Sequence, residues 1–331
     1  MSTFAGVVLF AGVLIYAVLG GADYGAGFWD LTAGGAERGR GPRRLVDASL
    51  APVWEANHVW VVFILVMLWT GFPVAFAAIM TTLYVPLGLT ALGIVLRGSG
   101  FAFRKVMVRT SQQRVTGAAF AISSLLTPFF LGTIAGGIAS GRVPTAGHGD
   151  AVRSWLNPTS LLGGALAVLS CAFVAAVFLT AEARRRRDAG LETWFRRRSL
   201  AAAVITGAVS LAGIAVLHGD SPRLFHELLG RGLPLVLLAA LCGLASVVLL
   251  RRLAPRLLEG LAVAAVAAVI VGWGVAQYPY LLGTHLTIAQ AAAPTPTLWA
   301  LTVVAAAALL LVVPAMALLF VLAQRGRLED H

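Results

Sequence analysis

The stretch Trp54-Glu55-Ala56-Asn57-His58-Val59-Trp60 places an acid and a histidine inside a long apolar run, residues 45–71. One membrane crossing needs about 20 apolar residues, so the run is long enough to span a bilayer. A carboxylate inside such a run is costly to bury and usually serves a function. We therefore predict that this segment is a transmembrane helix with an ionisable cluster inside it.

The apolar character of this segment extends over the whole chain. Of its 331 residues, 59% are hydrophobic and 12% are charged, whereas about 25% are charged in a soluble domain. The sequence therefore predicts an all-α integral membrane protein, with nine transmembrane helices in one membrane domain, 1–331. The predicted helices cover about 4–28, 45–71, 74–96, 115–139, 159–181, 200–217, 233–250, 257–278 and 298–323.

The basic residues predict an orientation. Of the 25 Lys and Arg residues, all except Arg142, Arg153, Arg223 and Arg231 follow the odd-numbered runs, including Arg97 after the third. Such residues collect on the cytoplasmic side, which predicts an N-terminus outside and a C-terminus in the cytoplasm. The same placement argues against nucleic-acid binding despite the formal net charge of +11, since a nucleic-acid surface needs a basic stripe on one face.

Spacing along the second run puts Glu55 deep in the membrane. In a continuous helix it would lie about 16 Å beyond Arg44, roughly the middle of the hydrocarbon core. His58 follows three residues later and shares its face, and Asp47 lies two turns back on the same face. An intramembrane acid with polar neighbours is typical of a proton path.

We predict a proton path formed by Glu55, His58, Asp23 and Asp47. The structural alternatives are a carboxylate that only bridges helices and a histidine that is satisfied in the core. For Asp23 and Asp30, near the end of the first run, the structural alternative is at least as good.

Two tryptophans, Trp54 and Trp60, flank the acid in the same run. Tryptophan usually gathers at membrane interfaces. Inside the membrane it indicates a face against another large apolar object, either a partner helix or a planar cofactor. We favour a partner.

A histidine census argues against haem in this chain. A protein that holds its own haems across a membrane needs paired axial ligands in its helices, and His58 is the only histidine within an apolar run. Predicted loops contain His148, His218, His226 and His285. We predict no catalytic residue, metal site or directly bound cofactor.

Small residues also recur at helical spacing. Gly21 and Gly25 form one small-xxx-small pair, and Gly132 and Gly136 form another. Such pairs let helix backbones approach closely, so we expect both to mark helix contacts.

Three stretches resemble one known family. They are 20–27 (GGADYGAG), 51–60 (APVWEANHVW) and the segment from Tyr278-Pro279 to 286–294 (LTIAQAAAP). The chain resembles subunit II of cytochrome bd-type quinol oxidases, and the 51–60 stretch has the form also seen in cyanide-insensitive oxidases. The resemblance covers nearly the whole chain.

The resemblance implies two four-helix bundles, within 1–140 and 159–278, plus a peripheral helix at 298–323 of a bacterial cell-membrane protein. It implies a heterodimer with a haem-bearing subunit I that holds haems b and d and oxidises quinol. A small accessory membrane subunit, lipid and quinone are further candidate partners. This chain would support assembly and supply protons and oxygen, without binding haem.

Residue by residue, the resemblance assigns the proton-path acid to Glu55, where many relatives have aspartate. It places Trp60 near the route by which oxygen enters, and we group Trp54 and Asn57 with it as the oxygen-route and subunit-contact set. The alternative function is a proton-coupled secondary transporter that uses Glu55. That class predicts helices broken near the midplane and inverted repeats, and the sequence shows neither clearly.

Overall fold

The computed structural model describes the chain except residues 36, 51–53, 107–109, 147, 251 and 325–331. Side chains at 50, 54–56, 101, 104–106, 110–115, 316–317 and 319–324 also lie outside the description. The regular secondary structure of the described chain is helical apart from one short antiparallel hairpin, β1 (Tyr280–Leu282) with β2 (Leu286–Thr287). The helices are α1 (Ser2–Leu31), α2 (Arg40–Leu50), α3 (Trp54–Gly71), α4 (Pro73–Thr82), α5 (Tyr84–Val106), α6 (Thr110–Ala139), α7 (Pro158–Arg185), α8 (Ala189–Asp220), α9 (Pro222–Leu229), α10 (Leu233–Val248), α11 (Pro255–Gln277), α12 (Ile288–Ala291) and α13 (Thr295–Gln324).

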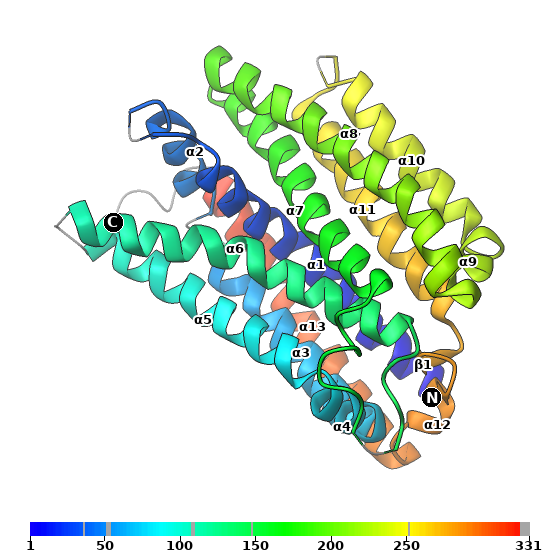
Figure 1. The fold of residues 1–331 in the computed structure, drawn as a ribbon. Helices are drawn as coiled ribbons and strands as arrows, with labels where there is room; N and C mark the ends of the chain where they lie inside the picture. The colour runs from blue at the N-terminus through cyan, green and yellow to red at the C-terminus, as the bar shows by residue number, and fades with distance from the viewer. Residues whose placement is uncertain (36, 51–53, 107–109, 147, 251, 325–331) are drawn as a thin grey trace.

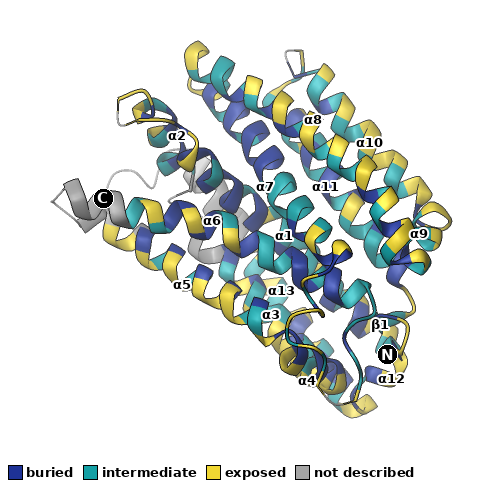
Figure 2. Cartoon of the chain, in the orientation of Figure 1, coloured by how far each residue is buried: buried dark blue, intermediate teal, exposed yellow. Residues whose placement is uncertain are grey.

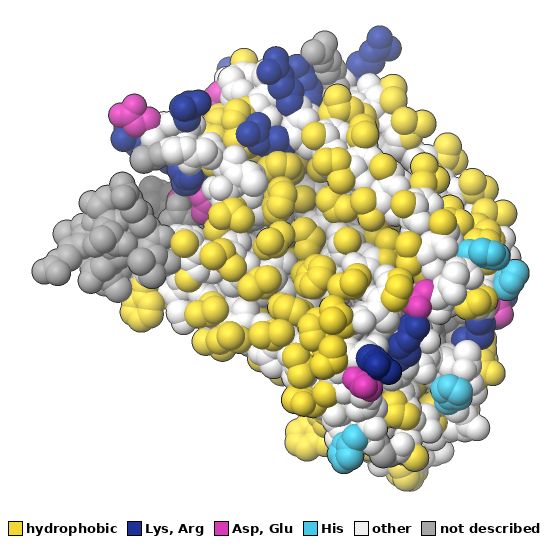
Figure 3. Space-filling model, in the orientation of Figure 1, with side chains coloured by type: hydrophobic (Ala, Val, Ile, Leu, Met, Phe, Trp, Pro, Cys, Tyr) yellow, Lys and Arg dark blue, Asp and Glu magenta, His cyan; other side chains and the backbone are white. Residues whose placement is uncertain are grey.

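Within the described residues, six helices are long and apolar enough to cross a membrane: α1, α6, α7, α8, α11 and α13. Two bent pairs, α3 with α4 at 117° and α9 with α10 at 73°, raise the number to eight. Hydrophobic side chains cover the middle of the molecule, while Lys and Arg gather at the end that carries α2 and histidines lie at the opposite end (Figure 3). The chain is thus an all-α multi-pass membrane protein.

Local sequence sets where several helices begin. Asn157 accepts a hydrogen bond from the Ser160 backbone N–H over 3.0 Å at the start of α7, and Asp188 accepts one from Leu191 over 2.9 Å at the start of α8. Proline is the first residue of α4, α7, α9 and α11, a position where its missing N–H has no helical partner to lose.

The described parts of the predicted second helix are α2, which ends at Leu50, and α3, which begins at Trp54. Residues 51–53 between them lie outside the description, so one continuous helix over 45–71 stays a prediction. The run 74–96 is divided between α4 and α5 at Leu83, in place of the single helix predicted there.

Helix α7 is the centre of the molecule and contacts α1, α6, α8 and α11 (Figure 1). Both predicted small-residue pairs face it. A side chain at Gly25 of α1 would overlap the Cys171 backbone, and one at Gly132 of α6 would overlap the Gly163 carbonyl. The absence of side chains therefore permits both close approaches.

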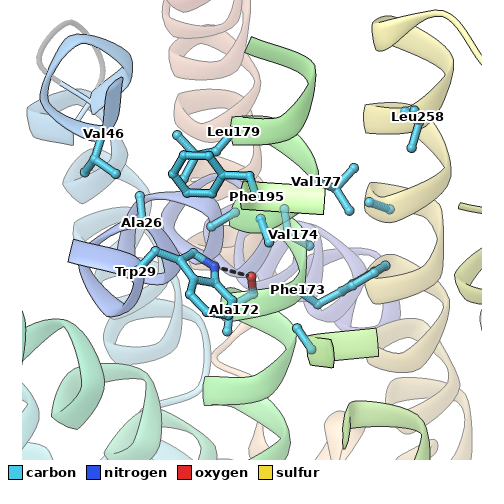
Figure 4. Packing of buried hydrophobic residues seen from close by; sticks show 14 of the residues in the cluster. Ala26, Trp29, Val46, Ala172, Phe173, Val174, Val177, Leu179, Phe195 and Leu258 are labelled. Carbon is cyan, nitrogen blue, oxygen red and sulfur yellow. Dashed lines mark hydrogen bonds between the residues drawn. The ribbon is translucent and has the colours of Figure 1, made fainter. Parts of the chain in front are cut away.

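Aromatic packing reinforces the contact between α1 and α7. Trp29 donates a hydrogen bond from Nε1 to the Ala172 carbonyl over 2.8 Å (Figure 4). Around it, Phe173, Val177 and Phe195 are almost fully buried. This core joins α1 and α2 to α7, α8 and α11.

A second core lies towards the opposite end from α2. It includes Met67, Phe72, Leu83, Leu282 and Leu298, so it joins α3, α4 and α13 to the hairpin. Burial follows the inward faces of the helices, and the outward faces of α8 and α10 remain exposed (Figure 2). The two cores leave a polar region between them along α1.

Candidate functional site

Among the described residues, the most deeply buried charge is Arg97 of α5, which has no exposed surface. Its Nη2 donates to Oδ1 of Asp23 on α1 over 2.8 Å and to the Asp23 carbonyl over 3.0 Å, and its Nη1 donates to Ser124 Oγ on α6. The sequence-based placement of Arg97 in a loop was therefore wrong. Arg97 instead joins three helices inside the molecule.

Aromatic rings cover the guanidinium of Arg97. Its Cζ lies 4.7 Å from the ring centroid of Tyr24 and 4.6 Å from that of Phe120. A cation held over aromatic faces is attracted by the ring quadrupole, most strongly where water is excluded. The Tyr24 hydroxyl also pairs with the Tyr16 hydroxyl at 3.0 Å, which extends the polar region along α1.

Asn57 and His58 of the Trp54–Trp60 stretch lie beside this region. His58 is half-buried and lies close enough to interact electrostatically with both Asp23 and Arg97. Asn57 is 5% exposed, and its Nδ2 lies 3.4 Å from the Leu19 carbonyl of α1. The structure thus brings together Asp23 and His58 from the predicted proton path.

Glu55 is the second residue of α3, one turn before His58, and its side chain lies outside the described part of the chain. The depth of about 16 Å depends on an unbroken helix from Arg44, and residues 51–53 lie outside the description, so this depth stays a prediction. Because Asn57 lies beside Leu19, the first turn of α3 falls well inside the length of α1. Asp47 is half-buried on α2, and its shared helix face with Glu55 also stays a prediction.

Of the two flanking tryptophans, the structure describes the side chain of Trp60, while that of Trp54 lies outside the described residues. Trp60 is only 3% exposed and packs with Tyr16 and Tyr24, with its ring 6.0 Å from that of Phe63. Trp60 therefore faces α1 within its own chain.

Asp30 lies seven residues after Asp23 on α1, about 10 Å nearer the end that carries α2. Arg43 of α2 donates from Nε to its Oδ1 over 2.9 Å and from Nη2 to the Gly34 carbonyl over 2.6 Å. This pair holds α2 against the end of α1. Acids are thus spaced along one side of α1 from its end to the buried pair.

At the opposite end, two histidines lie in helices rather than in predicted loops. His218 is in the last turn of α8, with its ring 4.8 Å from that of Phe225, and His226 is in α9. Among the described residues, no group of three or more His, Cys, Asp or Glu gathers as a metal site would require.

The fold and site define a class: multi-pass helical membrane proteins with a charged, hydrogen-bonded centre buried among the helices. Residues 1–323 match the family model described as cytochrome bd terminal oxidase subunit II. Because the match covers almost the whole sequence, the chain belongs to this family and is a subunit of a bacterial respiratory oxidase of the cytochrome bd type.

Individual relatives agree with the family match. The chain is 25% identical over 250 residues, 74% of this chain and 70% of the relative, to cytochrome bd ubiquinol oxidase subunit 2 of Bacillus subtilis. It is 28% identical over 225 residues, 64% of this chain and 56% of the relative, to cytochrome bd-I ubiquinol oxidase subunit 2 of Escherichia coli K12. The bd oxidase structure from Geobacillus thermodenitrificans matches with a TM-score of 0.82 at 25% identity, covering 96% of this chain and 97% of that chain.

The sequence-based site omitted Arg97, Ser124, Tyr24 and Tyr16. One signal for Arg97 was present: the apolar and small residues 98–103 continue the run beyond it, so it is an isolated charge inside a helix. An isolated charge in such a position usually has a partner on another helix. No comparable local signal distinguishes the tyrosines or the serine.

Proposed function

We propose that the chain is the non-haem subunit of a terminal oxidase that oxidises quinol and reduces oxygen to water. In this proposal a haem-bearing subunit I holds haems b and d and the quinol site, and this chain supports assembly and supplies protons and oxygen. The observation that carries the proposal is the family match over residues 1–323. The names of the relatives, which are ubiquinol oxidase subunits, favour quinol as the reductant.

For the proton supply, we infer a path that runs from the end carrying α2 towards the buried pair. Asp47 and Glu55 would receive protons there, and Asp23 and His58 would pass them onward. Carboxylates and imidazole exchange protons readily, whereas the arginine guanidinium keeps its proton in proteins. Arg97 is therefore a positioning residue that fixes Asp23 over 2.8 Å rather than a station on the path.

For the oxygen supply, we assign the route along α3 to Trp54, Asn57 and Trp60. The buried position of Trp60 supports a wall inside this chain more directly than a contact with the partner. An apolar wall suits oxygen, which is uncharged and dissolves in the lipid.

We further propose nine crossings, with α5 as the ninth beside the eight described above. α5 has 23 residues, about 35 Å of helix, enough for a bilayer core. Contacts among α1, α3, α5 and α6, and among α7, α8, α10 and α11, support two four-helix bundles with α13 peripheral. The arginine-rich end would face the cytoplasm, with the N-terminus outside.

The transporter alternative loses its basis. A transporter would have helices broken near the midplane. Two bent pairs are present, but the bend between α3 and α4 lies at Phe72, beyond the end of α3. Family membership places the chain in an oxidase instead.

Co-purification tests the proposal. The tagged chain is isolated in mild detergent, and a reduced-minus-oxidised spectrum is recorded alongside quinol-driven oxygen consumption. We expect a haem-bearing membrane subunit in a fixed ratio and oxygen consumption by the complex. If the chain emerges without a haem-bearing partner, the proposal fails.

A further inference from the structure

Helices α10 and α11 leave a groove between them at the arginine-rich end of the molecule. The groove has a volume of about 430 Å³. Its lining is apolar except for one arginine. The groove is lined by residues that include Leu249, Leu253, Leu257, Leu261, Gly260 and Arg256.

Two exposed arginines stand at this groove, Arg256 in its lining and Arg252 in the turn beside it. The backbone N–H of Arg252 donates to the Leu249 carbonyl over 2.9 Å, which fixes Arg252 next to a groove residue. Within the described part of the chain, neither arginine forms a salt bridge with a carboxylate.

Two carboxylates at this end of the molecule are bound to other arginines. Glu192 accepts a hydrogen bond from Arg184 over 2.8 Å, and Glu259 accepts one from Arg185 over 2.7 Å. The positive charge beside the groove is therefore not neutralised by these acids.

Described residues on both sides of position 251 are hydrogen-bonded to α7. Arg184 donates from Nη1 to the Leu253 carbonyl over 2.8 Å and from Nη2 to the Leu250 carbonyl over 2.7 Å. These two residues beside the groove are therefore attached to α7 without a ligand.

We propose that this groove binds an anionic phospholipid. One acyl chain lies along the leucines and Gly260, and the phosphate lies against Arg252 and Arg256. The apolar lining fits a hydrocarbon chain, and the two uncompensated arginines at the membrane boundary select a net negative headgroup over a zwitterionic one.

The experiment uses the whole purified complex in nanodiscs. Phosphatidylglycerol and phosphatidylcholine, each with a photoreactive group in one acyl chain, are crosslinked in parallel, and the labelled peptides are mapped. We expect phosphatidylglycerol to label residues 245–261 roughly tenfold more than phosphatidylcholine, in line with the attraction of two arginines. Arg252→Gln with Arg256→Gln should lower that labelling to the phosphatidylcholine level.

Two matched controls isolate the cause. Arg196→Gln with Arg197→Gln removes the same charge from α8 near the same end and should leave the labelling unchanged. Gly260→Leu places a side chain in the groove without changing the charge. A Cβ at this position meets no atom within 4 Å, so there is room for the new side chain. This variant should abolish labelling by both lipids. Gly207→Leu, at an equally open position on α8, should not.

Three results would overturn the proposal. They are equal labelling by the two lipids, which indicates ordinary bilayer contact; displacement of the label by an isoprenoid quinone; and unchanged phosphatidylglycerol labelling in Gly260→Leu. The last decides the matter even if the arginine variants do not assemble. Haem content is read separately, so failure here is distinguishable from failure of the oxidase assignment.

Discussion

Arg97 on α5 and Asp23 on α1 form an ion pair of 2.8 Å in which the arginine side chain is fully buried and the aspartate side chain is 4% exposed. The two residues lie on different helices and are 74 positions apart in sequence. Burying two charges is favourable only when each finds its hydrogen bonds. Here Ser124 and the Asp23 carbonyl supply further acceptors for the guanidinium.

Removing one partner should therefore be costly. We expect Arg97→Met to destabilise the protein by about 3–5 kcal/mol, because Asp23 is left charged and buried. Thermal unfolding of the purified complex, followed by fluorescence and haem absorbance, measures the loss. In the double variant Arg97→Met with Asp23→Leu, no charge is left unpaired, so stability should partly return. A double variant no more stable than Arg97→Met would contradict the ion-pair explanation.

The proton-path assignment makes Glu55 the decisive residue. We expect Glu55→Gln to reduce quinol-driven oxygen consumption severely, because the amide cannot take up a proton, while the complex assembles with normal haem content. Glu55→Asp, which keeps a carboxyl group that can take up a proton, is the matched control and should retain most turnover. Wild-type turnover in Glu55→Gln would remove Glu55 from the path.

The oxygen-route assignment predicts a different phenotype for Trp60. We expect Trp60→Ala to change the oxygen concentration for half-maximal turnover several-fold in the complexes that assemble. Trp60→Phe, which keeps a ring against Phe63, should have a smaller effect. If Trp60→Ala lowers only the yield of complex and leaves the oxygen dependence unchanged, then Trp60 serves packing alone.

The close contact between α6 and α7 predicts a position-specific effect of one methyl group. Gly132→Ala should destabilise the protein by about 1–3 kcal/mol, because its Cβ overlaps the Gly163 carbonyl and overpacking forces the helices apart. Gly117→Ala, on the same helix with no atom within 4 Å of the added carbon, is the control. Equal unfolding temperatures for the two variants would show that the contact is not tight.

At the end away from α2, the Arg142–Asp220 salt bridge should contribute more to stability than the Arg231–Glu227 salt bridge. It accepts from both Arg142 nitrogens, at 2.6 and 3.0 Å, and from the Thr159 hydroxyl at 2.6 Å. We expect Asp220→Ala to cost about 2–3 kcal/mol, since several donors lose their acceptor. Glu227→Ala breaks only the exposed pair with Arg231 and should cost less than about 1 kcal/mol. Similar losses in a denaturation series would contradict this ranking.

Sequence reasoning succeeded where one local property decides the structure. Hydropathy located the long helices, and the predicted end of the second run at residue 71 coincides with the end of α3. The small-residue pairs at Gly25 and Gly132 predicted close helix contacts, because the absence of a side chain can be read directly from the sequence.

It failed where the partner of a residue is remote in sequence. Arg97 was assigned to a loop because arginines usually mark the ends of membrane helices. Nothing near it in sequence indicates Asp23, which becomes its neighbour only through the packing of α5 against α6 and of α6 against α1.

The central position of α7 has a consequence for biogenesis. During synthesis α1, α3, α5 and α6 enter the bilayer first, and the Arg97–Asp23 pair joins helices that are all present by then. The glycine-containing faces of α1 and α6 can pack only after α7 has been made. Ala172 of α7, which accepts the hydrogen bond from Trp29, lies 143 residues after it. The nascent N-terminal half thus neutralises its buried charge early but exposes its close-packing faces to lipid or an insertase until the ribosome has made α7.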